Sequence, residues 1–417
     1  MRTLDAAIRS DFPVLDRQFQ GKRLVYLDNA ATTQKPKQVV DAISSFYLNN
    51  NANVGRSMYG LSLESNGAYG GARNLVKKLL HSRTAREIVF TRGTTEAINL
   101  VANSLGEILV QAGDEVLITA MDHHGNMCPW QALCQRKGAT LRIAPLDETG
   151  ALDLEGFRRS IGKRTKIIAV PHVSNVLGAV NPIEALIQEA HRHDVPILID
   201  GAQAVGHMAV DVQRLDCDFY CFSGHKMYAP MGIGVLYGKE KWLERMPPYQ
   251  TGGGVVFDVA YDRITWLRNA PEKFEAGTPN VEGAVGLGAA IKYLLDIGFD
   301  QLRKHEKALL AYAAEQLGSV PGLSILGAPK ERSGLLSFNL EGIHPYDVGL
   351  QTSAQGIAMR TGVQCAIPLM NKLKLPVGNV RASFGLYNTR EEVDVLRDAL
   401  TNVKPGFWTL QKPNDRM

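Results

Sequence analysis

The chain contains 417 residues, of which 45% are hydrophobic and 21% charged, and its formal net charge at pH 7 is +4. This length suits one large and one smaller domain, and the composition is ordinary for a soluble globular protein. A net charge this small argues against a nucleic acid or a membrane surface as partner, and no apolar run is long enough to span a bilayer. The five cysteines have no paired spacing and the first residues lack the apolar core of a secretion signal, so we expect a reducing, cytoplasmic location.

The N-terminal region predicts a short amphipathic segment followed by a strand. Leu4, Ile8 and Phe12 are spaced as on one helix, so residues 1–20 should form a segment that packs on the body of the protein. Residues 24–33 predict a strand that runs into a turn of small residues. A helix over residues 36–49 and a polar loop over residues 51–60 should follow.

Residues 87–100 predict a strand, a turn and a helix, with Gly93, Thr94 and Thr95 at the helix start. Free backbone N–H groups and the helix dipole at such a position bind phosphate, and the hydroxyls add donors. The alternative is a plain threonine cap.

A histidine pair follows the next predicted strand, residues 115–120. The flat ring of His123 can stack on a planar ligand and shuttle protons, whereas His124 suits structural hydrogen bonds. A metal site is the alternative, but no third and fourth ligands stand at metal spacing, so we expect no metal.

Polar side chains also follow two further strands. Asn175 comes soon after residues 165–170, and Asp200 ends the apolar run 195–200, just before Gln203. A buried aspartate needs a charged or hydrogen-bonding partner, and a buried amide is often satisfied by backbone alone. Alternating strands and helices predict a mostly parallel sheet covered on both faces, with ligands at the carboxyl ends of its strands.

Lys226 stands at the end of the aromatic-rich run 219–228, after Ser223 and His225. A lysine at the mouth of a buried strand loses hydration, and this favours the neutral amine that forms a Schiff base with an aldehyde cofactor. Ser223 and His225 are placed to donate hydrogen bonds to a phosphate. Asp200 facing a pyridinium nitrogen would complete the pair that pyridoxal phosphate enzymes need.

On Asp200 and Lys226 together, the chain resembles the fold-type I pyridoxal phosphate enzymes of the class V aminotransferase group. Within that group it is similar to the group II (Suf/Csd-type) cysteine desulfurases, from about Leu24 to Asn388. The resemblance implies an α/β fold with a large, mostly parallel, seven-stranded-type sheet domain (residues 21–297). A small α+β domain (residues 298–417) should carry the catalytic cysteine.

The resemblance assigns roles to residues that match the family's motifs. The catalytic residues would be Lys226, Cys365 and His123. Pyridoxal 5′-phosphate would be bound by Thr94, Thr95, His123, Asn175, Asp200, Gln203, Ser223, His225, Lys226 and, from the neighbouring subunit of a homodimer, Thr278. The substrate would be bound by Ala30, Ala31, Asn175, Arg360 and Arg381.

Cys365 lies in a short motif, residues 359–369, that carries Arg360, Gly362, Cys365 and Ala366 as group II desulfurases do. A lone cysteine is more often a buried hydrophobe, but the turn residues around Cys365 should let it reach the cleft. Two positions depart from the family: Gly55 and Gln364 stand where relatives have histidine. A nearby imidazolium lowers a thiol pKa, so without one we expect slow turnover in the absence of a partner.

Arg381 is the expected clamp for the substrate carboxylate, because a guanidinium holds a carboxylate through two parallel hydrogen bonds. The alternative for Arg381 is a surface salt bridge.

The implied reaction converts L-cysteine to L-alanine and leaves the sulfur on Cys365 as a persulfide. A sulfur-acceptor protein would collect it for iron–sulfur cluster or other thio-cofactor assembly, with selenocysteine and cysteine sulfinate as side substrates. The rivals are another enzyme of the same fold, such as an aminotransferase or lyase, and a catalytically weak sulfur-relay scaffold.

Overall fold

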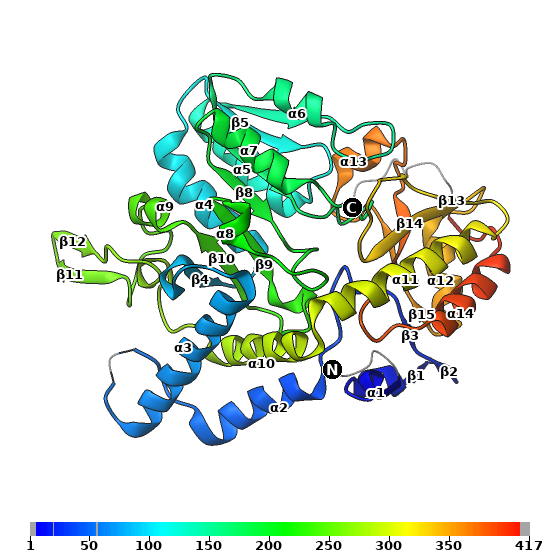
Figure 1. Ribbon diagram of the computed structural model, residues 1–417, viewed down its shortest axis with the longest axis horizontal. Coiled ribbons are helices and arrows are strands. Elements are labelled where there is room, and N and C mark those ends of the chain that lie inside the picture. The colour runs from blue at the N-terminus through cyan, green and yellow to red at the C-terminus, as the bar shows by residue number, and fades with distance from the viewer. Residues whose placement is uncertain (1–5, 20, 56, 409–417) are drawn as a thin grey trace.

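The structure is a computed structural model that describes residues 6–19, 21–55 and 57–408 (Figure 1). Its centre is a seven-stranded sheet in the order β4-β10-β9-β8-β7-β5-β6. β10 runs antiparallel to both neighbours and the other pairings are parallel, which confirms the predicted mostly parallel sheet. The strands are β4 (Ile88–Thr91), β5 (Glu115–Thr119), β6 (Thr140–Ala144), β7 (Thr165–Pro171), β8 (Ile197–Asp200), β9 (Phe219–Ser223) and β10 (Gly234–Gly238).

Both faces of the sheet are buried, because successive residues of a strand point to opposite sides. In β5, Val116 and Ile118 join one apolar core with α4 (Thr94–Leu109) and α5 (His124–Lys137). Leu117 joins the other core, with α7 (Ile183–Arg192) and α10 (Val281–Ile297). Burial on both faces explains why these strands are continuous apolar runs. The shorter helices α6 (Leu154–Ser160), α8 (Val212–Leu215) and α9 (Glu240–Arg245) complete this domain.

Three helices gather at one side of the large domain, at the lower left of Figure 1. α10 packs against α2 (Lys37–Ser45) and α3 (Gly60–Leu80). The helix predicted over residues 36–49 is confirmed. It begins one residue after Pro36, which has extended dihedral angles, and ends as a π-helical turn, Phe46–Asn50.

An exposed hairpin that the sequence did not predict projects from the large domain (Figure 1). It consists of β11 (Val256–Ala260) and β12 (Arg263–Trp266), and most of its side chains are exposed. Without a buried face it lacks the alternation by which a strand is recognised.

The C-terminal domain is the predicted α+β layer. Its antiparallel sheet has the order β13-β14-β17-β16, and α11 and α14 pack beside each other on it, at the right of Figure 1. The elements are α11 (Phe299–Gly318), β13 (Leu323–Ile325), β14 (Leu335–Leu340), α12 (Pro345–Ser353), β15 (Ile357–Ala358), β16 (Arg360–Gly362), α13 (Ile367–Lys372), β17 (Asn379–Ser383) and α14 (Arg390–Thr401).

The N-terminal segment contains the expected helix. In the part that the structure describes, α1 (Ala6–Arg9) ends before Pro13, and a 3-10 turn, Pro13–Asp16, follows; Phe12, the residue before the proline, has non-helical dihedral angles. Ile8 and Phe12 are buried as expected, and Leu4 lies outside the described residues. A small hairpin follows, made of β1 (Gln18–Phe19) and β2 (Lys22–Arg23).

Residues 24–33, predicted as a strand that runs into a turn of small residues, begin with the short strand β3 (Val25–Tyr26), which pairs with β15 of the C-terminal domain rather than with the large sheet. Val25 and Leu27 pack in the C-terminal core. This segment therefore connects the two domains.

A buried ion pair also joins the domains. His207 Nδ1 lies 2.9 Å from both carboxylate oxygens of Glu306 on α11, and each side chain is 6% exposed. Although burial lowers the pKa of His207, the effect of the Glu306 carboxylate is larger, and the pKa is raised above its ordinary value.

Among the described helices, none combines the length and the hydropathy needed to cross a membrane.

Candidate active site

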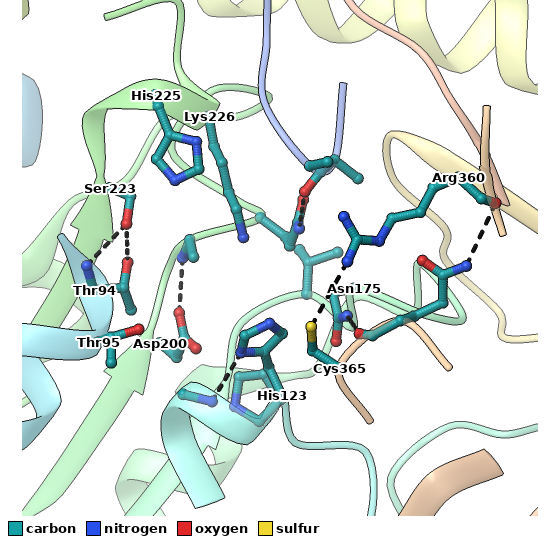
Figure 2. A pocket seen from close by; sticks show the side chains of 18 of the residues that line it. Thr94, Thr95, His123, Asn175, Asp200, Ser223, His225, Lys226, Arg360 and Cys365 are labelled. Atoms are coloured by element: carbon teal, nitrogen blue, oxygen red, sulfur yellow. Dashed lines mark hydrogen bonds between the residues drawn. The ribbon is translucent and has the colours of Figure 1, made fainter. Parts of the chain in front are cut away.

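A cavity of about 250 Å³ opens where the carboxyl ends of β7, β8 and β9 meet the C-terminal domain (Figure 2). This is the edge of an open α/β sheet where ligands bind. Most of the predicted site residues line it. They are Ala30, Ala31, Thr94, Thr95, His123, Asn175, Asp200, Gln203, Ser223, His225, Lys226, Arg360, Cys365 and Arg381, joined by Gly125, Pro171, Val173, Ala202 and Gln364.

Lys226 lies on the turn that follows β9, and its amine points into the cavity (Figure 2). Loss of hydration lowers the pKa of Lys226 to about 8, against the opposing effect of the Asp200 carboxylate. At pH 7 about one amine in ten is then neutral, compared with about one in three thousand for an ordinary lysine. Lys226 therefore lies in the cavity with a lowered pKa, and its role as the nucleophilic amine stays a prediction.

Asp200 ends β8 and is 7% exposed. Its Oδ1 accepts a hydrogen bond from the Ala202 N–H at 2.9 Å. Burial raises the pKa of Asp200, which that bond and the Lys226 charge oppose. A buried carboxylate of this kind is stabilised by a cation, so the protonated ring nitrogen of a pyridine cofactor fits the cavity beside it.

Hydrogen-bond donors converge at another part of the cavity, the N-terminus of α4. The Thr94 N–H and hydroxyl both lie 2.8 Å from Ser223 Oγ, and Thr95 lies beside them (Figure 2). His225 Nδ1 is buried and has no hydrogen-bond partner among the described residues. Burial lowers the pKa of His225 to about 4, so the ring is neutral. A helix start with hydroxyls and a neutral imidazole beside it is the kind of position where a phosphate binds.

His123 caps the N-terminus of α5, and its ring lies in the cavity (Figure 2). Its Nδ1 accepts a hydrogen bond from the Gly125 N–H at 2.9 Å, which fixes the ring and leaves the proton on Nε2. Burial, reinforced by the Lys226 charge, lowers the pKa of His123 to about 3. The side chain is therefore a neutral, oriented ring that can stack on a planar ligand and hold a proton towards it.

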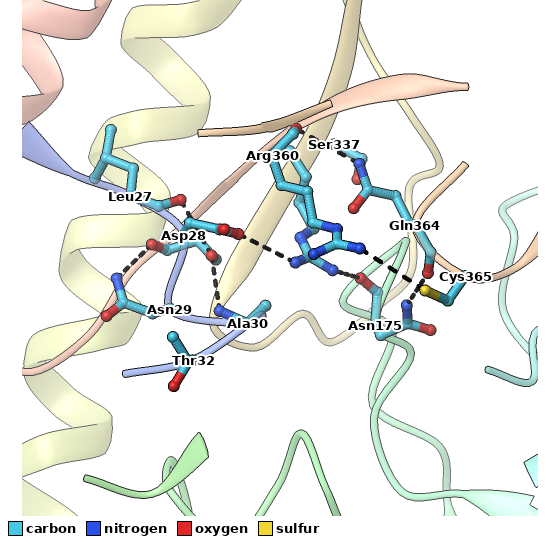
Figure 3. A network of polar contacts seen from close by, with 12 residues as sticks. Leu27, Asp28, Asn29, Ala30, Thr32, Asn175, Ser337, Arg360, Gln364 and Cys365 are labelled. Atoms are coloured by element: carbon cyan, nitrogen blue, oxygen red, sulfur yellow. Dashed lines mark hydrogen bonds and ion pairs between the residues drawn. The ribbon is translucent and has the colours of Figure 1, made fainter. Parts of the chain in front are cut away.

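Arg381 and Arg360 bring two guanidinium groups into the cavity, and Figure 3 shows Arg360 beside Cys365. Arg381, on β17, is 2% exposed, which excludes the surface salt bridge considered as the alternative. It donates to the Asn175 carbonyl at 2.8 Å and lies 3.4 Å from Asp28, while its Nε is buried without a partner among the described residues. Burial lowers the pKa of Arg381 to about 10. Two cations here leave charge for a substrate carboxylate to neutralise.

Cys365 lies in the loop that joins β16 to α13, and we call residues 363–366 the thiol loop. Gln364 and Cys365 both have left-handed backbones, with φ of +53° and +54°, a conformation that costs about 1–3 kcal/mol per residue. The Asn175 side chain donates to the Gln364 carbonyl at 2.8 Å, and Arg360 Nη2 lies 3.7 Å from Cys365 Sγ (Figures 2 and 3). Contacts with other parts of the chain therefore hold the strained loop with its sulfur in the cavity.

Gln203 lines the cavity as well, whereas Thr278 and Gly55 do not. Gln203 donates to the Ala30 carbonyl at 2.8 Å and so fixes the small-residue turn. Thr278 is exposed and lines a separate hollow with Arg92 and Gln250. Gly55 is exposed with φ of +118°, a conformation that would strain a histidine at this position.

The sequence did not single out Asp28 as a site residue, although its carboxylate lies 3.4 Å from the Arg381 guanidinium. Burial raises the pKa of Asp28, and the two guanidinium groups lower it. The only sign of Asp28 in the sequence was a carboxylate at the start of the small-residue turn.

Among the described residues, no group of three or more histidine, cysteine, aspartate or glutamate side chains is arranged to hold a metal ion.

Comparison with known proteins covers nearly the whole chain. Residues 25–396 match the family model for class-V aminotransferases. A probable cysteine desulfurase of Halalkalibacterium halodurans is 47% identical over 96% of this chain and 98% of its own length. A cysteine desulfurase of Salmonella typhimurium is 49% identical over 95% of this chain and 97% of its own.

Solved structures of cysteine desulfurases are similar in fold. The CsdA enzyme of Escherichia coli superposes with a TM-score of 0.88 at 39% identity, and the enzyme of Thermococcus onnurineus with a TM-score of 0.91 at 38% identity. Both alignments cover 96% of this chain and 98% of the other.

Proposed function

The chain belongs to the class-V aminotransferase family and, within it, to the cysteine desulfurases, and from this premise we propose that it converts L-cysteine to L-alanine and keeps the sulfur on Cys365 as a persulfide. One observation supports the assignment to Cys365. Among the described residues it is the one cysteine that lines the cavity, where it faces the same space as Lys226 and Asp200. Cys134, Cys217 and Cys221 are buried in the large domain, where burial raises the pKa of each thiol.

Pyridoxal 5′-phosphate is the cofactor of this family, and the residues of the cavity fit it. Its aldehyde would meet Lys226, its ring nitrogen Asp200, its ring face His123, and its phosphate the start of α4 with Ser223 and His225. When bound, the cofactor supplies an electron sink for charge that develops on the substrate.

Different side chains of the protein bind the substrate, remove its α-proton and donate a proton to the product. Arg381 and Arg360 hold the substrate carboxylate and so fix the α-carbon relative to Lys226. The Lys226 amine, of which the lowered pKa leaves about one in ten neutral at pH 7, takes the proton from that carbon. His123, with its proton on Nε2, is placed to give a proton to the product side of the reaction.

The sulfur step needs no external oxidant. The Cys365 thiolate attacks the substrate sulfur, so a sulfur–sulfur bond forms while the bond from sulfur to the β-carbon breaks. The electron pair of the broken bond goes to the β-carbon, which takes up a proton. Cysteine and an enzyme thiol thus become alanine and an enzyme persulfide. The Arg360 guanidinium, 3.7 Å from Cys365 Sγ, helps to hold the sulfur in the cavity.

The proposal extends to partners. A persulfide must be passed on, so we expect a sulfur-acceptor protein and a role in iron–sulfur cluster or other thio-cofactor assembly. The exposed position of Thr278, outside the cavity, supports a homodimer in which this residue reaches the neighbouring site. Selenocysteine and cysteine sulfinate are expected side substrates. Five free cysteines support a cytoplasmic location.

A single-turnover experiment tests the assignment. Cofactor-loaded protein is mixed with one equivalent of L-cysteine, and the thiols are trapped and digested for mass spectrometry. We expect one extra sulfur on the Cys365 peptide and one alanine for each persulfide, and neither in Cys365→Ala. Alanine from Cys365→Ala at the wild-type rate would contradict the proposal, and a keto acid in place of alanine would indicate an aminotransferase.

A further inference from the structure

His124 binds the thiol loop from the opposite domain. It is the first residue of α5, next to His123, but it does not line the cavity. Its backbone N–H donates to the Cys365 carbonyl at 2.8 Å. Its imidazole Nε2 accepts a hydrogen bond from the Ile367 N–H, the first residue of α13, at 3.0 Å. One residue of the large domain therefore contacts the chain at Cys365 and two residues beyond it.

The thiol loop depends on such contacts because its own hydrogen bonding is slight. Between the end of β16 and the start of α13, the Ala366 N–H bonds to the Val363 carbonyl at 2.9 Å. Gln364 is 3% exposed, and its side-chain oxygen is buried without a partner among the described residues. Two consecutive left-handed residues would relax if nothing opposed them.

We propose that His124 is a positioning residue that holds the start of α13 and thereby sets where the Cys365 sulfur lies relative to the substrate sulfur. This inference rests on the proposed function, in which Cys365 takes the sulfur. The imidazole accepts the Ile367 N–H only while it is neutral, and burial lowers the pKa of His124, so the bond is present at pH 7. A reacting atom displaced by about 1 Å reacts up to about a hundredfold more slowly.

Loss of the His124–Ile367 hydrogen bond should affect only the step in which sulfur passes to Cys365. Lys226, Asp200 and Arg381 lie on β8, β9 and β17 or the turns that follow them, and none contacts His124 through a described hydrogen bond. Loss of the bond to Ile367 should therefore slow sulfur transfer to Cys365 and leave proton removal at the α-carbon unchanged.

Two matched variants test this inference. In His124→Gln the amide oxygen stands the same number of bonds from the backbone as Nε2 and can still accept the Ile367 N–H. In His124→Asn the same amide is one methylene shorter and cannot reach. Both variants keep the backbone bond to Cys365, and recovery of the yellow cofactor-bound form with a wild-type melting temperature checks that each is folded.

Three assays are run on the holoenzymes. The first gives kcat and KM for alanine formation, the second gives the rate of exchange of the α-hydrogen of L-alanine with deuterated solvent, and the third gives the rate of alkylation of Cys365 by iodoacetamide. For His124→Asn we expect a kcat lowered about three- to tenfold, the effect of one hydrogen bond. KM and the exchange rate should be unchanged, and alkylation severalfold faster. His124→Gln should stay within about twofold of wild type in all three.

Equal kcat values for the Gln and Asn variants would overturn the proposal, whether both are active or both impaired. A fall in α-hydrogen exchange that parallels the fall in kcat would also overturn it, because the effect would not be specific to the thiol loop. Wild-type alanine formation by Cys365→Ala is a separate outcome that would refute the proposed function itself.

Discussion

The two walls of the cavity are built in different ways. The wall from the large domain places Lys226 and Asp200 at the ends of strands that are buried on both faces, so core packing fixes them. The wall from the C-terminal domain places Cys365 in a loop with two left-handed residues, held by hydrogen bonds from Asn175 and His124. Substitutions in the first wall should abolish alanine formation, whereas substitutions of the residues that hold the thiol loop should lower its rate only in part.

Among these predictions, substitution of Lys226 should lower the rate of alanine formation most. Lys226→Ala removes the amine that we propose both to bind the cofactor and to act as the base at the α-carbon, so alanine formation should fall about a thousandfold or more. Lys226→Arg is the matched control: it keeps the positive charge but cannot become neutral, and it should lose as much. Steady-state assays of alanine measure both variants, and appreciable activity in Lys226→Arg would contradict the role of a neutral amine.

Arg381 should affect substrate binding more than cofactor binding. Arg381→Lys keeps the charge but loses the two parallel hydrogen bonds, so KM for L-cysteine should rise about ten- to a hundredfold. The yellow absorbance should be as in wild type. If the KM of Arg381→Lys were unchanged, Arg360 alone would be the carboxylate clamp.

Because the pKa of Lys226 is lowered, the rate at which the large-domain wall binds the cofactor should depend on pH. Because only the neutral amine reacts and the pKa is about 8, the rate at which the apoprotein binds pyridoxal phosphate should rise about tenfold per pH unit below pH 8 and level off above it. Stopped-flow absorbance measures this rate. A rise that continued to pH 10 would show an ordinary lysine.

The smallest effect on activity should come from the ion pair that joins the domains. Because the pKa of His207 is raised in the folded state, the pair stabilises the protein fully below about pH 6.5, the ordinary histidine pKa, and this contribution is lost as pH rises through the raised value. Glu306→Gln should lower the free energy of unfolding by about 1–3 kcal/mol at pH 6. Urea unfolding at pH 6 and pH 9 should show the difference from wild type shrinking, and a constant difference would mean that His207 is uncharged in the fold.

Sequence and structure agree best on the first wall. β8, β9 and the start of α4 could be predicted because a buried strand is a continuous apolar run and its end is visible in the residues that follow. The seven-stranded sheet and the α+β domain follow from the same patterns and the family resemblance.

The second wall could be predicted only in part. The motif around Cys365 was visible, but the contacts that hold it join residues far apart in the sequence, such as His124 and Ile367 or Asn175 and Gln364. The pairing of β3 with β15 was hidden for the same reason, since two-residue strands carry no periodicity.

The most direct test of the difference between the walls is a comparison of two rates in Cys365→Ala, loaded with cofactor. The first is exchange of the substrate α-hydrogen with solvent, which needs only the large-domain wall and the carboxylate clamp. The second is alanine formation from L-cysteine, which needs the thiol loop as well. We predict exchange at the wild-type rate with no alanine formed. Loss of both would show that Cys365 supports the first wall, and alanine formed at the wild-type rate would show that the sulfur does not pass through Cys365.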